Sequence, residues 1–136
     1  MVKFKEYWGC WELSMNILHF EYSDFFRNYI RDLVEKSGHH YLSETQGRSL
    51  FNTLAMHEVD IIITGLELSD MKGEELIAQL QTSKFKNIPV IVVTSAAVSN
   101  LNTRLKGVHF DDFILKENLN FDSFSKCIDR IEDNVH

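Results

Sequence analysis

Three polar residues lie at the ends of short apolar runs, and their side chains suit the binding of an anion. Thr94 ends the run 90–94, and Ser95 adds a second hydroxyl. Lys116 follows the run 112–115 and carries an ammonium group. Such runs are typical of strands in a parallel sheet, and open parallel sheets bind ligands at the carboxyl ends of their strands. These residues therefore predict a polar cleft at that edge of the sheet.

The run 60–64 is followed by a residue without a reactive side chain. An acid opens the run and three consecutive isoleucines follow, a pattern that suits a strand buried on both faces. Gly65 comes next, at the position that would face a ligand. Glycine has no side-chain oxygen that could attack a phosphorus centre, so covalent phosphoryl transfer to this position is excluded.

Apolar runs of strand length alternate with segments of helical period from Met15 onward. This alternation predicts an α/β fold, with a parallel sheet covered by helices on both faces. The expected strands are residues 16–20, 40–43, 60–64, 90–94 and 112–115. Five helices are expected: one after the cap Ser23, one at 47–57, one after Gly73, one at 99–105 and one at the end of the chain. In the first, second, third and last of these helices, respectively, the inward faces are formed by Phe26, Ile30, Leu33 and Val34; by Leu50, Phe51 and Leu54; by Leu76, Ile77 and Leu80; and by Phe121, Phe124, Ile128 and Ile131.

The segment 60–73 closely resembles the centre of bacterial response-regulator receiver domains, the phosphate-accepting modules of two-component signalling. The resemblance extends over about 15–132 and rests on several motifs in the same order. In that family the strand matching 60–64 ends in the phosphate-accepting aspartate, where this chain has Gly65. The resemblance implies a flavodoxin-like, doubly wound, five-stranded parallel sheet in the order 2-1-3-4-5. It also implies a degenerate receiver without its acceptor.

The resemblance indicates which residues line the vestigial phosphoacceptor pocket. Two adjacent acids of the family correspond to Glu21 and Tyr22, so one acid is lost. Because Mg²⁺ needs several oxygen ligands, we expect Mg²⁺ binding to be lost or very weak, and we expect no other cofactor. The complete set of pocket residues is Glu21, Tyr22, Gly65, Glu67, Thr94, Ser95, Phe113 and Lys116.

Lys116 matches the lysine that pairs with the acceptor or the phosphoryl group in the family. Since that partner is absent, we expect Lys116 to pair with Glu21, the retained opposite charge at the same edge. Partial exposure would limit the contribution of the pair to about 1 kcal/mol. The alternative is that Lys116 extends into water without a partner.

Two buried positions invite a structural interpretation. Phe113 matches an aromatic position that changes rotamer in many receivers, but without a phosphoryl trigger we expect an ordinary core phenylalanine. His19 lies in a predicted buried strand and is expected to be a hydrogen-bonded core histidine. No nucleophile, base and orienting residue come together in the sequence, so we expect no enzymatic activity.

Length and composition are those of one globular domain, expected at 15–136, preceded by an aromatic-rich extension at 1–14. Phe4, Tyr7, Trp8 and Trp11 crowd into this extension. One interpretation is an extra turn of helix packed on the domain. The other is an arm that binds a partner or a second copy, because tryptophan and tyrosine are favoured at interfaces.

Charge and hydropathy exclude several kinds of partner. The formal net charge of −6 disfavours nucleic-acid binding. No apolar run approaches the roughly 20 residues of a membrane span. Cys10 and Cys127 lack metal-ligand spacing, so we expect reduced thiols and a cytoplasmic location.

The expected function is a phosphorylation-independent protein-interaction module in signal transduction, within a longer or tandem regulator. Its contact surface would be the face at about 99–131, formed by the fourth helix, fifth strand and last helix. That face would bind a partner protein, a neighbouring output domain or a second copy. A small ligand or anion held by Thr94, Ser95 and Lys116 is the alternative. Phosphotransfer through Asp70 is a third, weaker interpretation.

Overall fold

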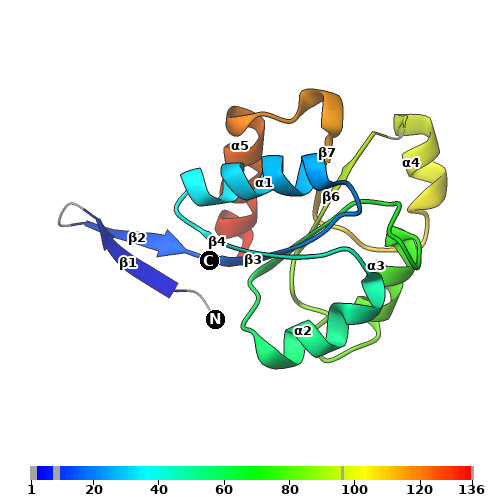
Figure 1. The fold of residues 1–136 in the computed structure, drawn as a ribbon, viewed down its shortest axis with the longest axis horizontal. Coiled ribbons are helices and arrows are strands. Elements are labelled where there is room, and N and C mark those ends of the chain that lie inside the picture. The colour runs from blue at the N-terminus through cyan, green and yellow to red at the C-terminus, as the bar shows by residue number, and fades with distance from the viewer. Residues whose placement is uncertain (1–2, 8–9, 96, 136) are drawn as a thin grey trace.

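The computed structural model describes residues 3–7, 10–95 and 97–135. Within these residues the chain forms a central sheet of five parallel strands, in the order β4-β3-β5-β6-β7 (Figure 1). This is the predicted 2-1-3-4-5 order. The strands are β3 (Asn16–Phe20), β4 (His40–Glu44), β5 (Ile61–Thr64), β6 (Val90–Thr94) and β7 (Asp112–Leu115).

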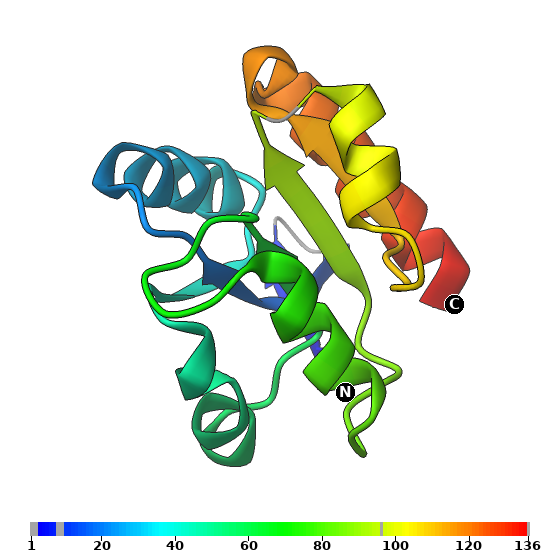
Figure 2. The ribbon, with the colours of Figure 1, turned by 90° about the vertical axis from the view of Figure 1, so that its right-hand side faces the viewer.

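Helices cover both faces of this sheet (Figures 1 and 2). The helix α1 (Asp24–Lys36) and the helix α5 (Phe121–Val135) lie on one face. The other face carries α2 (Leu50–Met56), α3 (Gly73–Gln81) and α4 (Val98–Arg104). None of the helices in the described part of the chain has the length and apolar character needed to cross a membrane.

The two-residue period of the strands creates two separate cores. On β3, Ile17 packs under α1 and α5, whereas Leu18 and Phe20 pack under the opposite layer. The two central strands β5 and β6 are buried along their whole length. This accounts for their almost continuous apolar sequences.

Acids fix the starts of the strands. Asp60 Oδ2 accepts the backbone N–H of Asn16 at 2.8 Å, and Asp111 Oδ2 accepts that of Val90 at 2.8 Å. Ser23 caps α1, as predicted, by accepting the N–H of Phe26 at 3.4 Å. The contacts of Asp60 and Asp111 join neighbouring strands at their starts, and the parallel strands then end together at the opposite edge.

Two predicted core residues are exposed instead. The segment expected to be one helix at 47–57 divides into a short 3₁₀ turn, Gly47–Ser49, and α2. Phe51, expected to face inward, is 40% exposed and stacks on Phe85. Phe121 is 48% exposed because it is the first residue of α5 and lies at the end of the helix layer formed by α1 and α5.

The extension forms a β-hairpin, so the expected extra turn of helix is wrong. Strands β1 (Lys3–Tyr7) and β2 (Cys10–Ser14) pair in antiparallel fashion and project from the domain (Figure 1). Aromatic residues favour strands over a short helix, which explains the difference. Trp8 lies outside the described residues. The hydroxyl of Ser14 donates to the carbonyl of Gly38 at 3.3 Å, where β2 leads into β3.

Candidate functional site

The carboxyl ends of the strands bring the predicted site residues to one edge of the sheet. Glu21 follows β3, Gly65 follows β5, Thr94 ends β6 and Lys116 follows β7. Glu21, Gly65 and Thr94 are buried, and Lys116 is half-buried. This edge is therefore a packed cluster of polar groups below the surface.

Glu21 and Lys116 form the predicted ion pair. Glu21 Oε1 lies 3.1 Å from Lys116 Nζ, and the glutamate side chain is only 4% exposed. Oε1 has no aligned hydrogen bond among the described residues, so the contact is an ion pair rather than a directed bond. The other oxygen, Oε2, accepts the backbone N–H of Ser23 at 3.1 Å.

The burial of Glu21 changes the expected energy of this pair. The limit of about 1 kcal/mol assumed an exposed pair. Glu21 is instead surrounded by protein, and removing one member of a buried pair typically costs about 3–5 kcal/mol. The pairing was predicted correctly, and the assumed exposure of the glutamate was wrong.

A second group holds Lys116 in place, and the sequence did not indicate it. The ammonium nitrogen lies 4.1 Å from the centre of the Phe26 ring on α1, a cation–π contact. Phe26 was predicted only as an inward-facing helix residue. Its partner depends on how α1 lies over the sheet edge, which helical periodicity does not give.

Gly65 lies next to the carboxylate of Glu21, where a larger side chain would contact that carboxylate. Its N–H donates to the carbonyl of Phe20 at 2.9 Å, so the backbone is fixed there. A Cβ atom added to this glycine would lie 3.2 Å from Glu21 Oε1, closer than ordinary van der Waals contact. The carboxylate of Glu21 thus lies against the position of the missing side chain.

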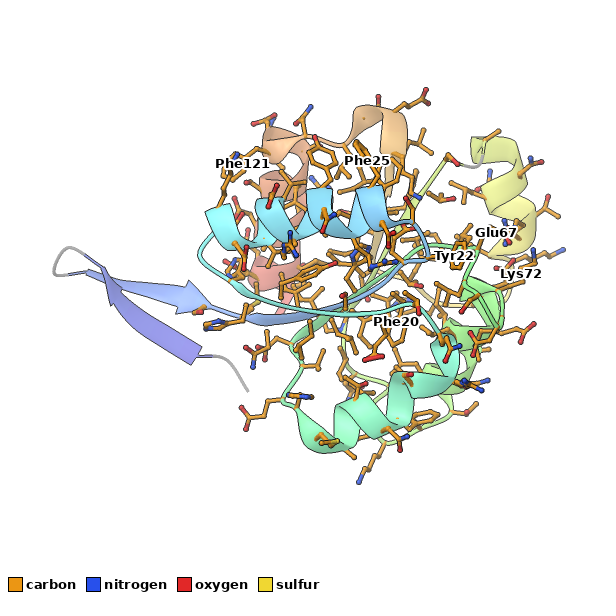
Figure 3. All side chains as sticks on the ribbon, in the orientation of Figure 1. Phe20, Tyr22, Phe25, Glu67, Lys72 and Phe121 are labelled. Carbon is orange, nitrogen blue, oxygen red and sulfur yellow. The ribbon has the colours of Figure 1, made fainter. Side chains whose placement is uncertain are left out.

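Three predicted pocket residues lie outside this cluster. Tyr22 is 64% exposed, and its carbonyl accepts from Arg27 Nη1 at 2.8 Å. Ser95 is exposed at the surface. Glu67 is exposed as well and contacts Lys72 Nζ at 2.5 Å (Figure 3). Of the two predicted hydroxyl residues, Thr94 is part of the buried edge and Ser95 is not.

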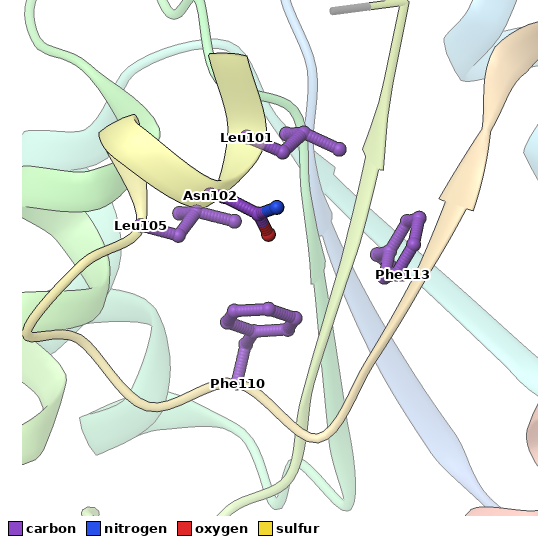
Figure 4. A pocket seen from close by; sticks show the side chains of 5 residues that line it. All are labelled: Leu101, Asn102, Leu105, Phe110 and Phe113. Atoms are coloured by element: carbon purple, nitrogen blue, oxygen red, sulfur yellow. The ribbon is translucent and has the colours of Figure 1, made fainter. Parts of the chain in front are cut away.

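Phe113 is not the core residue that we expected. Its side chain is 39% exposed, because β7 is an edge strand and this position faces the open space beside α4. There it borders an apolar hollow of about 190 Å³ (Figure 4). The hollow is lined by Leu101, Asn102, Leu105, Phe110 and Phe113.

His19 is a hydrogen-bonded core histidine, as predicted. It is fully buried, and its Nδ1 lies 2.7 Å from the hydroxyl of Tyr41. That hydroxyl donates its single proton to the carbonyl of Arg27, so it must accept from Nδ1–H. Nε2 is then a buried acceptor without a donor among the described residues. Burial, together with the smaller effects of the charges of Lys116 and Arg27, lowers the pKa of His19 to about 3.

Other candidate groups outside this cluster serve structure. Asp70 accepts the N–H groups of Gly47 and Arg48 with its two oxygens, at 2.8 and 3.0 Å. The buried thiol of Cys127 has a pKa raised to about 12 by burial and by Asp112. Among the residues that the structure describes, no three histidine, cysteine, aspartate or glutamate side chains group in a way that could hold a metal ion.

Comparison with known proteins identifies the family. Residues 17–128 match the model of the response regulator receiver domain. The chain belongs to this family. It is a receiver domain of a two-component signalling protein. It is also 28% identical over 87 residues to the polar-differentiation response regulator DivK of Brucella anthropi, an alignment that covers 63% of this chain and 71% of DivK.

Solved receiver domains share the fold at lower sequence identity. The signal receiver domain of a histidine kinase from Syntrophus aciditrophicus superimposes with a TM-score of 0.80 and 24% identity, covering 89% of this chain and 92% of that one. The receiver domain of the sensor histidine kinase PA1611 from Pseudomonas aeruginosa PAO1 has a TM-score of 0.78 and 14% identity, with 86% and 96% covered. That domain was solved with a magnesium ion coordinated in its active site cleft.

Proposed function

We propose that this receiver domain signals without phosphorylation, through contacts with a protein partner. The observation that carries the proposal is the Glu21–Lys116 pair beside Gly65. Gly65 supplies no nucleophile, and the lysine that would contact a phosphoryl group already has a carboxylate partner. The site is therefore filled from within the chain, and its state does not depend on a phosphate donor.

We infer in the same way that Mg²⁺ does not bind at this edge. Glu21 is the carboxylate retained at the matched positions, and its two oxygens face Lys116 and the Ser23 N–H. Mg²⁺ requires near-octahedral oxygen coordination, and the ammonium of Lys116 would repel it. These residues do not fit the metal that the PA1611 receiver holds.

Neither alternative chemistry has support from the contacts at the site. Asp70 lies beyond the strand end and uses both oxygens to hold the turn at Gly47 and Arg48, so it is a poor displaced acceptor. A small anion would need a free cation in the cleft. The charge of Lys116 is already balanced by Glu21, so we favour protein docking over ligand binding.

We propose the face formed by α4, β7 and α5 as the contact surface. It exposes the ring of Phe113 beside the apolar hollow under α4. A hollow of about 190 Å³ has room for an apolar side chain of a partner. Aromatic anchors in such positions carry much of the energy of protein interfaces. The partner is a neighbouring output domain, a second protein or a second copy of this chain.

Incubation with acetyl phosphate and Mg²⁺ tests the first part of the proposal. The intact mass should remain unchanged, whereas a receiver that retains its acceptor aspartate, treated in parallel, should gain a phosphoryl group. A hydroxylamine-labile adduct on any residue of this chain would overturn the proposal.

Photo-crosslinking tests the contact surface. A benzoylphenylalanine at position 113 should yield a discrete crosslinked product in the cells that produce the chain. The control carries the same group at position 56, since Met56 is 78% exposed and belongs to α2, which is not part of the proposed α4–β7–α5 surface. Equal products from both positions, or none from position 113, would count against this surface.

A further inference from the structure

The helix α4 is held only weakly by its own sequence. It has seven residues, and its N-cap Ala97 offers no side-chain hydrogen bond. Helices this short are not stable alone in water. Leu101 and Leu105 are buried in the core below α4 and attach one face of it. An additional, polar contact reaches its C-terminal end.

Arg104 provides that contact with a dense set of charge-assisted hydrogen bonds. Its Nε and Nη2 donate to the two carboxylate oxygens of Glu74 at 2.8 and 2.9 Å. Its Nη1 donates to Glu67 Oε1 at 2.9 Å. Nη2 also lies 3.3 Å from the carbonyl oxygen of Leu66. A two-point contact of guanidinium with carboxylate fixes direction as well as distance.

These partners come from the segment that begins at the vacated site. Leu66 and Glu67 directly follow Gly65, and Glu74 lies in the first turn of α3. Lys72 also contacts Glu67, which keeps that carboxylate near the end of α4 (Figure 3). The bond from Lys72, and then that from Arg104, lower the pKa of Glu67, so it stays charged at neutral pH.

We propose that Arg104 is a positioning residue that fixes α4 on the loop after β5 and thereby holds the hollow beside Phe113 in one shape. Three of the residues that line the hollow, Leu101, Asn102 and Leu105, belong to α4 or adjoin it. Their place relative to Phe113 changes if α4 shifts. The docking role of the hollow rests on the proposed function, but the hold of Arg104 on α4 does not.

Amide hydrogen exchange of the whole chain, without any partner, tests this role. The N–H groups of Leu101 and Leu105 donate to the carbonyls of Ala97 and Leu101 and report on α4. In Arg104→Gln, these amides should exchange at least about tenfold faster at low salt. Arg104→Lys should restore only part of the protection, because an ammonium cannot contact both oxygens of Glu74 in the same way.

Salt separates an ionic hold from simple packing. Raising NaCl from about 0.05 to 1 M should speed exchange in α4 of the unchanged chain and have little effect in Arg104→Gln, because salt screens partly exposed charges. Glu74→Gln, which leaves the arginine stem in place, should loosen α4 in the same way. Arg130→Gln is the matched control, since Arg130 holds α5 on Asp112 at 2.6 Å and does not line the hollow.

Unchanged protection of α4 in Arg104→Gln would overturn the inference. So would faster exchange that is independent of salt and absent in Glu74→Gln, since that result indicates packing of the arginine stem. Because no partner is present in these measurements, their outcome is separate from that of crosslinking at position 113. Either proposal can therefore fail while the other stands.

Discussion

The two charged clusters of this domain differ in burial and in geometry. The side chains of Glu21 and Lys116 are 4% and 18% exposed, and they make one ion pair without an aligned hydrogen bond. Arg104 is 26% exposed and Glu67 62%, yet the arginine donates several well-aligned bonds. The buried Glu21–Lys116 pair therefore has the less well aligned contact of the two clusters.

This difference indicates that the two clusters do different work. An unpaired buried charge is costly, so we expect the fold to need the Glu21–Lys116 pair for stability. A partly exposed cluster contributes little to global stability but selects one position for a helix. The number of hydrogen bonds is therefore a poor guide to the effect of removing each cluster.

Removing the lysine should have the largest effect. Lys116→Met leaves the Glu21 carboxylate buried without its counter-ion and should lower the free energy of unfolding by about 3–5 kcal/mol. Lys126→Met is the control, because the Lys126–Asp122 pair is 68% and 77% exposed, and it should change stability by less than about 0.5 kcal/mol. Urea unfolding measures both. Equal losses would show that burial does not distinguish the clusters.

Placing an aspartate at position 65 should also destabilise the domain. Gly65→Asp places a second carboxylate against Glu21 and should cost about 1–3 kcal/mol, whereas Gly65→Ala isolates the smaller effect of the added Cβ. Gly65→Asp alone should not bind beryllofluoride with Mg²⁺, and we expect Tyr22→Asp to be needed as well. Binding by the single variant as tight as by the double variant would contradict our account of the missing cation.

The buried His19 should make the free energy of unfolding depend on pH. An unfolded histidine takes up a proton near pH 6.5, whereas folded His19 remains neutral down to about pH 3. The folded state then binds fewer protons, so the free energy of unfolding falls as the pH falls below 6.5, by up to about 1.4 kcal/mol per pH unit. His19→Gln should flatten the slope between pH 6.5 and 5, and His40→Gln, at an exposed position, should keep it.

The Arg104 cluster should have a smaller effect on global stability. Arg104→Gln is expected to lower the free energy of unfolding by about 1 kcal/mol at low salt and by less in 1 M NaCl. The effect of Lys116→Met should persist in both conditions, since salt does not screen a buried pair effectively. Urea titrations at two salt concentrations compare the variants. An equal response of both to salt would remove the distinction between the clusters.

The hairpin should affect stability least. A chain that begins at Met15 loses the Ser14–Gly38 contact and should unfold within about 1 kcal/mol of the full chain. If the hairpin joins two copies, light scattering will report a dimer for the full chain and a monomer for the shortened chain. A monomer in both cases would leave the hairpin without a role in self-association.

The carboxyl edge of the sheet shows which features of the site could be predicted from the sequence. The alternation of strands and helices predicted a parallel sheet, and the resemblance to receiver domains implied its strand order. Glu21, Gly65, Thr94 and Lys116 lie at one edge because parallel strands end on the same side. The pairing of Glu21 with Lys116 followed from this placement and from the resemblance, since these were the retained opposite charges at the same edge. Local periodicity together with the family resemblance was sufficient for these predictions.

The tertiary structure alone decided which side chains are buried and which non-local partners they meet. The contacts of Lys116 with Phe26 and of Arg104 with Glu74 join residues 90 and 30 positions apart, and their distances depend on where α1 and α4 lie over the sheet. Phe113 is exposed because β7 is an edge strand beside an open hollow, which an alternating pattern cannot show. Periodicity fixes the face of an element, whereas the packing of its neighbours fixes what that face contacts.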